Sequence, residues 1–179
     1  MASQKTESQK YSLIKQDREF EIRYYPSATM AKISSTAKTY KELSSPGFRK
    51  LAGYIFGGNQ EGKQIAMTIP VHMNFQEEGS SMAFVMPSKW DSNSLPKPND
   101  PGIEILTSPE EYVAAIRFGG FASDGSMQKH KDLLETWLKK EGIPFYGNFR
   151  FLGYNPPFQL MGRRNEIIIA IDWKNPEKP

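Results

Sequence analysis

The stretch Lys63-Gln64-Ile65-Ala66-Met67-Thr68-Ile69-Pro70-Val71 begins a run in which every second residue is apolar. Apolar side chains at alternate positions from Ile65 to Phe75 would share one face, as in a β-strand with one buried side. The run follows Gly57-Gly58-Asn59, a triplet typical of the end of a helix and the start of a turn. The stretch therefore predicts a helix followed by a strand that has one wholly apolar face.

A helical pattern precedes this strand. Its apolar positions follow the spacing i, i+3, i+4, i+7 and i+8 and are Phe48, Leu51, Ala52, Ile55 and Phe56. Ser45 is expected as the N-cap, with Pro46 at the first helical position, and Gly57 is expected to stop the helix. The pattern predicts a single apolar stripe along a helix that starts at residue 46.

The order of strand, strand, helix, strand, strand occurs twice, which indicates an internal duplication. In the first half the strands are expected at 20–25, 28–34, 65–75 and 82–86; in the second half at 103–106, 112–118, 149–154 and 166–173. The second helix is expected to be capped by Asp124 or Ser126 and to end at Gly142. Two helices over about eight strands predict an α+β domain, most simply a distorted β-barrel of two pseudo-symmetric halves.

Composition favours one soluble domain. The chain has 179 residues, of which 38% are hydrophobic, and we expect a flexible N-terminus over 1–10 and a single domain over 11–176. It has no cysteine, which excludes thiolate metal sites and cysteine nucleophiles. No secretory signal or membrane span is visible, so a cytoplasmic protein is expected. A net charge of +3 without an arginine-rich run gives no reason to expect nucleic-acid binding.

Four segments together resemble the SOUL family of haem-binding proteins. The stretch 63–71 is similar to the family signature K-x-I-A-M-T-x-P-V. Glu21 to Tyr25 resembles its E-I-R-x-Y strand, Gly47 to Ile55 its G-F-x-x-L-x-x-Y-I helix, and 153–166 its G-Y-x-P-P…R-R-N-E ending. The resemblance covers most of the chain. It implies a distorted barrel with two helices that binds haem or another tetrapyrrole as carrier, buffer or sensor, without an established reaction.

The resemblance also implies a site between the first helix and the loop before the last strand. The apolar slot would be formed by Phe48, Ala52, Ile55 and Phe56 on the helix, and the loop carries Phe158, Leu160 and Met161. A flat macrocycle needs such an apolar slot, and its propionates need cations, for which Arg49, Lys50 and Lys63 are candidates. The alternative is that the stripe only packs against the core, as helical stripes commonly do.

Tyr24 stands where some SOUL proteins have a histidine that has been proposed to bind iron. A tyrosine phenolate can ligate ferric haem, so Tyr24 is the candidate metal ligand, and an ordinary strand aromatic is the alternative. His72 is expected to face solvent, because it lies on the polar side of its strand. His130, on the apolar side of the second helix, could reach a ligand.

Glu166 supports a different class of function. It enters the apolar strand 167–171, where a carboxylate is costly unless it is paired, and Arg163 or Arg164 is the expected partner. Alternatively, Glu166 binds a cationic effector or orients a water for hydrolysis, as the likeness of the SOUL fold to effector-binding domains would allow. A third possibility is a fold that serves protein interaction without any cofactor.

Overall fold

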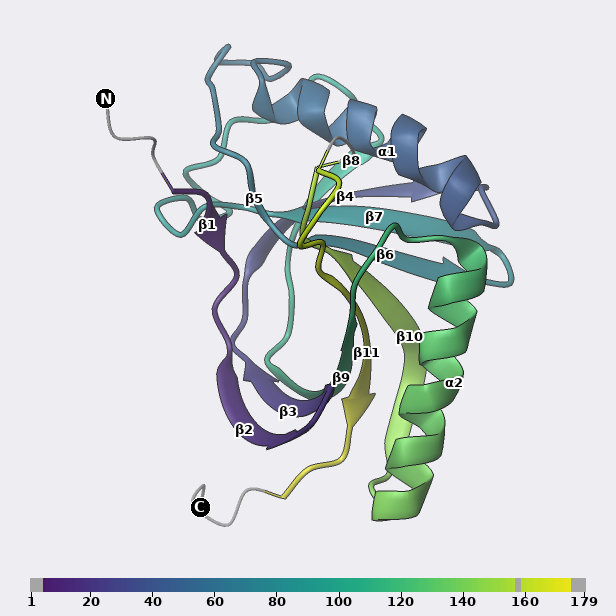
Figure 1. Cartoon of the computed structure of the whole chain (residues 1–179). Helices are drawn as coiled ribbons and strands as arrows, with labels where there is room; N and C mark the ends of the chain where they lie inside the picture. The colour runs from purple at the N-terminus through teal and green to yellow at the C-terminus, as the bar shows by residue number, and fades with distance from the viewer. Residues whose placement is uncertain (1–4, 157–158, 175–179) are drawn as a thin grey trace.

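The computed structural model describes residues 5–156 and 159–174 (Figure 1). Residues 157 and 158 of the predicted loop and the last two residues of the predicted domain 11–176 lie outside this description. The described residues form two helices and eleven strands: β1 (Glu7–Ser8), β2 (Ser12–Asp17), β3 (Phe20–Tyr25), β4 (Thr29–Ser35), α1 (Tyr40–Ile55), β5 (Thr68–Ile69), β6 (Val71–Gln76), β7 (Gly79–Val85), β8 (Ile103–Thr107), β9 (Glu111–Phe118), α2 (Asp124–Glu141), β10 (Phe145–Gly153) and β11 (Asn165–Ile171).

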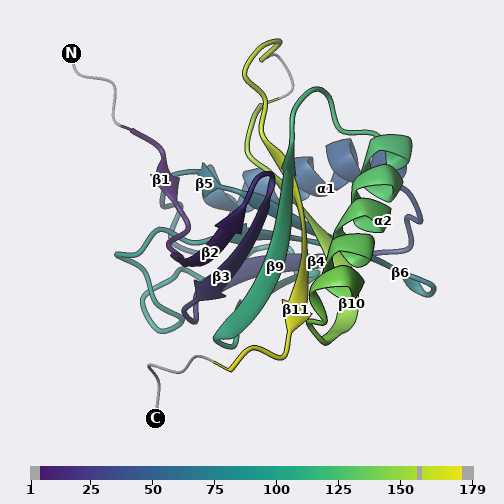
Figure 2. The ribbon, with the colours of Figure 1, turned by 60° about the horizontal axis from the view of Figure 1, so that its bottom comes forward.

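Nine strands form one antiparallel sheet in the order β2-β3-β9-β11-β10-β6-β7-β4-β8. The first half contributes β3, β4, β6 and β7, and the second half contributes the corresponding strands β8, β9, β10 and β11. From one edge the order is β8-β4-β7-β6, and from the β3 side it is β3-β9-β11-β10, with each strand at the position of its counterpart. The first strand of each half therefore pairs with the second strand of the other half. Figure 2 shows β2, β3, β9 and β11 side by side. This order agrees with two related halves. The edge strands β2 and β8 are not bonded to each other, so the predicted closure into a barrel is not confirmed.

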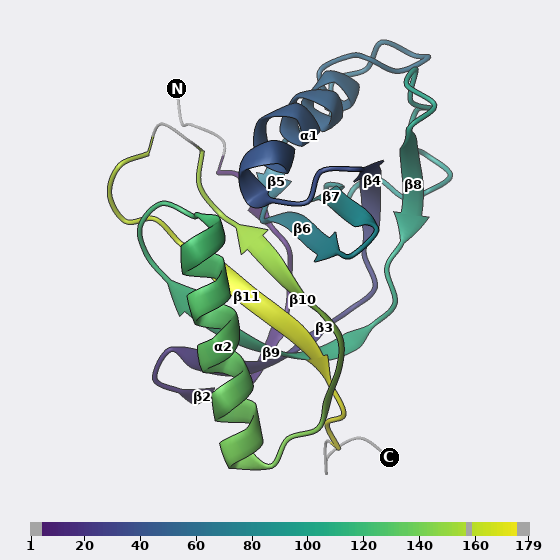
Figure 3. The same cartoon turned by 90° about the vertical axis from the view of Figure 1, so that its right-hand side faces the viewer.

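The two helices lie on the same face of the sheet, α1 against β4 and β7 and α2 against β9, β10 and β11 (Figure 3). Their buried residues share one core with the inward side chains of the strands, among them Leu51, Leu134 and Phe151. The opposite face carries two smaller apolar clusters, one around Tyr25 and one around Met30. Both faces of the sheet are therefore covered over much of its area.

The predicted start of the first helix is wrong. The helix begins at Tyr40, and Pro46 lies inside it. Thr39 is the N-cap, and its hydroxyl accepts a hydrogen bond from the backbone N–H of Glu42 at 3.2 Å. The signal was the Thr39-x-x-Glu42 spacing, which is typical of a helix N-terminus. Burial of Leu43, which is only 1% exposed, anchors this extra first turn to the core.

The second helix agrees more closely with the pattern. The predicted N-caps Asp124 and Ser126 are wrong, because Ser123 is the N-cap. Its hydroxyl accepts a hydrogen bond from the N–H of Ser126, and the Ser126 hydroxyl accepts one from the N–H of Ser123. Gly142 ends the helix in the left-handed conformation with φ 66°, as predicted.

The predicted strand 65–75 is split at Pro70, and the Ile69–Pro70 peptide bond is cis. Only β6, beyond the proline, belongs to the large sheet. The short β5 pairs in parallel with β1, and the N–H of Gln9 donates to the carbonyl of Ile69 at 2.8 Å. Part of the N-terminal segment that was expected to be flexible is thus hydrogen-bonded to this stretch.

Candidate functional site

Two aromatic side chains of α1 and its C-cap, Phe48 and Phe56, are exposed. Phe48 is 40% exposed and Phe56, the C-cap, is 59% exposed, whereas Ala52, at i+4 spacing from both, is only 9% exposed. The ring of Phe48 also packs against that of Phe84 on β7, with centroids 5.3 Å apart. Arg49, from the same helix, is also exposed. Ile55 is only 1% exposed and belongs to the core, so it cannot contact a ligand on this surface. The predicted stripe thus divides into a buried side and an exposed side.

The loop between β10 and β11 lies beside α1 (Figures 1 and 3). It presents Leu160, 75% exposed, and Met161, 85% exposed. Arg163 holds the loop in shape by donating to the carbonyls of Pro156 and Gln159, both at 2.8 Å. Together Phe48, Ala52, Phe56, Leu160 and Met161 are called the α1–loop surface below.

Arg163 also connects this loop electrostatically to the first residue of α1. Burial raises the pKa of the Tyr40 hydroxyl, and the charge of Arg163 acts against that rise. The backbone N–H of Tyr40 donates to the carboxylate of Asp124 at 2.8 Å. The start of α1, the start of α2 and the loop therefore meet at one place.

Tyr24 lies elsewhere. Its strand, β3, is at the opposite end of the molecule from α1 (Figures 1 and 3). The Tyr24 hydroxyl donates to the carboxylate of Glu110, and its ring lies 5.2 Å from that of Tyr112. With Tyr146 and Trp173 it lines a separate hollow of about 530 Å³. The structure thus does not bring Tyr24 together with the predicted helix residues.

Glu166 lies fully buried at the centre of an arginine network on the face opposite the helices. Its Oε1 and Oε2 accept hydrogen bonds from Arg23 at 2.7 and 2.6 Å. Oε2 also accepts from Nη2 of Arg164 at 2.9 Å, so the predicted pairing with Arg164 is confirmed. Arg117 lies 3.5 Å from the same oxygen. Arg23 in turn donates to Glu21.

The main partner of Glu166, Arg23, was missed in the sequence. Arg23 is 0% exposed although it alternates with apolar residues on β3, because both faces of this sheet are buried. Burial by itself raises the pKa of Glu166, but the hydrogen bonds and charges of Arg23 and Arg164 outweigh it and hold that pKa below its ordinary value. Burial also raises the pKa of Tyr25, which accepts a hydrogen bond from Arg23, to about 12.

This network gives Glu166 a structural role. Both of its oxygens accept hydrogen bonds from arginine, and the side chain is 0% exposed, so solvent does not reach it and the surrounding arginines would repel a cation. The arrangement therefore does not favour the effector-binding or hydrolase alternative centred on Glu166.

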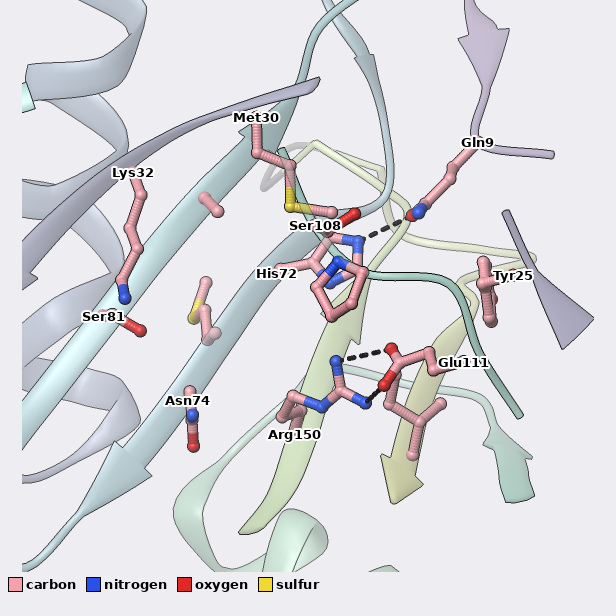
Figure 4. Close-up of a pocket in the computed structure, with 14 residues that line it drawn as sticks. Gln9, Tyr25, Met30, Lys32, His72, Asn74, Ser81, Ser108, Glu111 and Arg150 are labelled. Atoms are coloured by element: carbon pink, nitrogen blue, oxygen red, sulfur yellow. Dashed lines mark hydrogen bonds and ion pairs between the residues drawn. The ribbon is translucent and has the colours of Figure 1, made fainter. Parts of the chain in front are cut away.

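The prediction that His72 faces solvent is wrong. The imidazole is half-buried, its Nε2 lies 2.7 Å from Oε1 of Gln9, and it lines a cavity on the face opposite the helices (Figure 4). His72 is shielded from solvent because the N-terminal segment brings Gln9 over this strand. His130 is also half-buried: its ring stacks on Phe118 with centroids 3.8 Å apart. Neither histidine belongs to α1.

The imidazole of His72 is expected to stay neutral near physiological pH. Burial, with a smaller contribution from the charge of Arg150, lowers its pKa from 6.5 to about 3. Between these two values the unfolded chain binds this proton and the folded chain does not, so the folded state loses stability as the pH falls through that window. In NMR the ring signals of His72 should not titrate between about pH 5 and 8. A midpoint near 6.5 would contradict this expectation.

The chain matches known proteins over nearly its whole length. The family model described as SOUL heme-binding protein matches residues 6–170. Heme-binding protein 2 of Mus musculus is 31% identical over 157 residues, covering 83% of this chain and 76% of the relative. Heme-binding protein 1 of Mus musculus is 29% identical over 164 residues, covering 87% and 86%.

A solved structure, a hydrolase from Listeria innocua, shares the fold with a TM-score of 0.61 and 8% identity, over 94% of this chain and 100% of its own. At that identity the likeness shows the fold alone. No helix within residues 5–156 and 159–174 is long and apolar enough to cross a membrane. The match of the family model over residues 6–170, with the relatives that agree with it, places this chain in the SOUL haem-binding protein family.

Proposed function

We propose that this protein binds haem or a related tetrapyrrole non-covalently at the α1–loop surface, as a carrier, buffer or sensor. The observation that carries the proposal is that Phe48 of α1, Phe56 at its C-cap and Leu160 of the β10–β11 loop are all exposed, and that this loop lies beside α1 (Figure 1). Large apolar side chains gathered on one surface are typical of a binding site. Membership of the SOUL family and the names of the two mouse relatives supply the class of ligand.

The residues present fit a tetrapyrrole. The flat macrocycle is apolar on both faces and can lie between the phenylalanine rings of α1 and the loop. Ala52 has a small side chain between Phe48 and Phe56, which leaves room for the ring to approach the helix. Arg49 is exposed on the same helix and can pair with a propionate. When bound, haem would supply its own iron chemistry, and the protein would supply the apolar surface and the charge.

Phe48→Ser and Phe56→Ser are each expected to weaken hemin binding by about 10- to 100-fold. Losing one buried aromatic contact costs about 1.5–3 kcal/mol, which corresponds to that change in affinity. The measurement is an absorbance titration of the purified protein in the Soret region, repeated with iron-free protoporphyrin. Binding of both tetrapyrroles with similar losses in the variants would support recognition of the ring.

Leu133→Ser is the matched control, because Leu133 is 42% exposed on α2 and does not belong to the α1–loop surface. Tyr24→Phe tests the remaining candidate ligand and should leave the hemin spectrum unchanged, since Tyr24 is distant from α1. If Leu133→Ser weakens binding as much as Phe56→Ser does, the site is wrongly placed. If the wild-type protein gives no saturable shift with either tetrapyrrole, the proposed function fails.

A further inference from the structure

A second cavity lies on the face of the sheet opposite the helices, away from the α1–loop surface (Figure 4). Its volume is about 200 Å³. Strands β4, β6, β7 and β10 supply most of the lining, and Gln9, Ser108 and Pro109 add to it. A porphyrin does not fit a space of this size, because pockets for drug-sized ligands measure about 300–1,000 Å³.

The register of the sheet creates the hollow. One row of directly paired residues crosses β10, β6 and β7: Arg150, Asn74 and Ser81. In the next row Ala83 on β7 pairs with His72 on one side and with Lys32 on the other. Because the side chain of Ala83 is a single methyl group, there is space between two longer polar side chains.

The cavity is lined by one lysine, Lys32, that forms no ion pair within 4.0 Å among the described residues. Arg150 and Glu111 form a bidentate ion pair, with both N–O distances at 2.9 Å, and neutralise each other (Figure 4). Lys32 is half-buried. Its partner across β4 and β8 is the exposed Glu104, but no carboxylate of the described residues lies within 4.0 Å of its ammonium group and none of these residues hydrogen-bonds to it. His72 adds no charge, because burial keeps its pKa near 3. An anion would therefore be attracted to Lys32.

A buried acceptor in the same cavity also lacks a partner. The Oδ1 atom of Asn74 is buried without a hydrogen bond among the described residues. Such an atom loses free energy unless a donor reaches it. Ser81, paired directly with Asn74 across the strands, places a hydroxyl on the same side of the cavity as Lys32 (Figure 4).

We propose that this cavity binds a small monocarboxylate that carries a hydroxyl group. The carboxylate would face the ammonium group of Lys32 and the hydroxyl of Ser81, and the ligand hydroxyl would donate to Oδ1 of Asn74. The cavity volume of about 200 Å³ is sufficient for such a small ligand, since a cavity of about 150 Å³ holds one benzene molecule. This site is separate from the α1–loop surface and does not depend on tetrapyrrole binding there.

The test uses the full chain and three probes of one carbon skeleton: 3-hydroxybutanoate, butanoate and butane-1,3-diol. Calorimetry, with NMR of the His72 ring and the Met30 methyl group as reporters, measures binding. We expect 3-hydroxybutanoate to bind with a millimolar Kd, because so few atoms make contact. Butanoate should bind more weakly, because it leaves Asn74 unpaired, and the diol should not bind, because it lacks the charge.

Lys32→Met should lower the affinity for 3-hydroxybutanoate by about tenfold or more, which is the usual loss when one charge-assisted contact is removed. Ala83→Leu should abolish binding by filling the space. Lys15→Met is the matched control, because Lys15 is an exposed lysine on β2. This variant should bind 3-hydroxybutanoate with the affinity of the wild type. Circular dichroism confirms that each variant is folded.

Three results would overturn the proposal: no saturable binding of 3-hydroxybutanoate, equal binding of the diol, or unchanged affinity in folded Lys32→Met. Hemin titration of Lys32→Met separates the two sites. Unchanged hemin affinity together with lost carboxylate binding supports two independent sites. Loss of both would show that the cavity and the α1–loop surface are not separate, which contradicts the inference.

Discussion

Glu166→Gln is expected to lower the free energy of unfolding by about 3 kcal/mol or more, because removing one partner of a buried ion pair leaves the other charge uncompensated. The partner is Arg23, which is 0% exposed and, among the described residues, would keep only Glu21 as an ion-pair partner. The substitution preserves the size of the side chain, so the loss reports the charge and its hydrogen bonds. Urea denaturation at pH 7 measures it.

The pH dependence gives a second measure of the same network. The pKa of Glu166 in the folded state lies below its unfolded value of 4.5. A group of this kind contributes stability that is fully present above the unfolded pKa and is lost as the pH falls through the folded pKa. The difference between wild type and Glu166→Gln should therefore shrink in acid below pH 4.5. A constant difference across this range would contradict the assignment.

Glu135→Gln is the control for this experiment. Glu135 pairs with Lys139 one turn along α2, at 3.2 Å, on the surface of the molecule. Surface pairs of this kind contribute about 0.3–0.5 kcal/mol. If Glu166→Gln were no more harmful than Glu135→Gln, the carboxylate would be free to serve a ligand, and the alternative centred on Glu166 would gain support.

Asn59→Ala is expected to cost about 2–4 kcal/mol, at roughly 1 kcal/mol for each of four hydrogen bonds. The side chain of Asn59 is almost fully buried. Its amide nitrogen donates to the carbonyls of Tyr54 at 3.2 Å and Lys63 at 2.9 Å. Its oxygen accepts from the N–H groups of Glu61 at 3.2 Å and Lys63 at 3.0 Å. One side chain thus ties the end of α1 to the start of the stretch 63–71.

Asn99→Ala is the matched control, because Asn99 is exposed and substitutions of exposed side chains usually change stability by less than about 0.5 kcal/mol. Asn59→Asp should be at least as harmful as Asn59→Ala, since a carboxylate would face two carbonyl oxygens. Urea denaturation of the three variants measures the change in the free energy of unfolding. A change in Asn59→Ala no larger than that in Asn99→Ala would show that the turn forms without this side chain.

Local patterns predicted the parts of the fold that depend on neighbours along the chain. The apolar spacing of Leu51, Ala52 and Ile55 predicted α1, and Gly142 correctly marked the end of α2. The strands predicted at 112–118 and 166–173, which are mainly apolar runs, match β9 and β11 within two residues at each end. Such patterns are reliable because helix and strand periods are fixed by backbone geometry. The predicted start of α1 is wrong because Thr39, and not Ser45, is the N-cap.

The family and the α+β class followed from the sequence by itself, since they rest on motifs and periodicity, whereas the barrel is not confirmed and the candidate site residues of α1 stay a prediction. Tertiary structure decided the rest, because pairing between distant strands fixes which faces are buried. It buried Ile55, separated Tyr24 from α1, placed Arg23 against Glu166 across 143 positions, and brought Gln9 over His72. The charge of Lys32 beside Asn74 likewise exists only once β4, β7 and β6 are in register, since no spacing along the chain places those two side chains in one cavity.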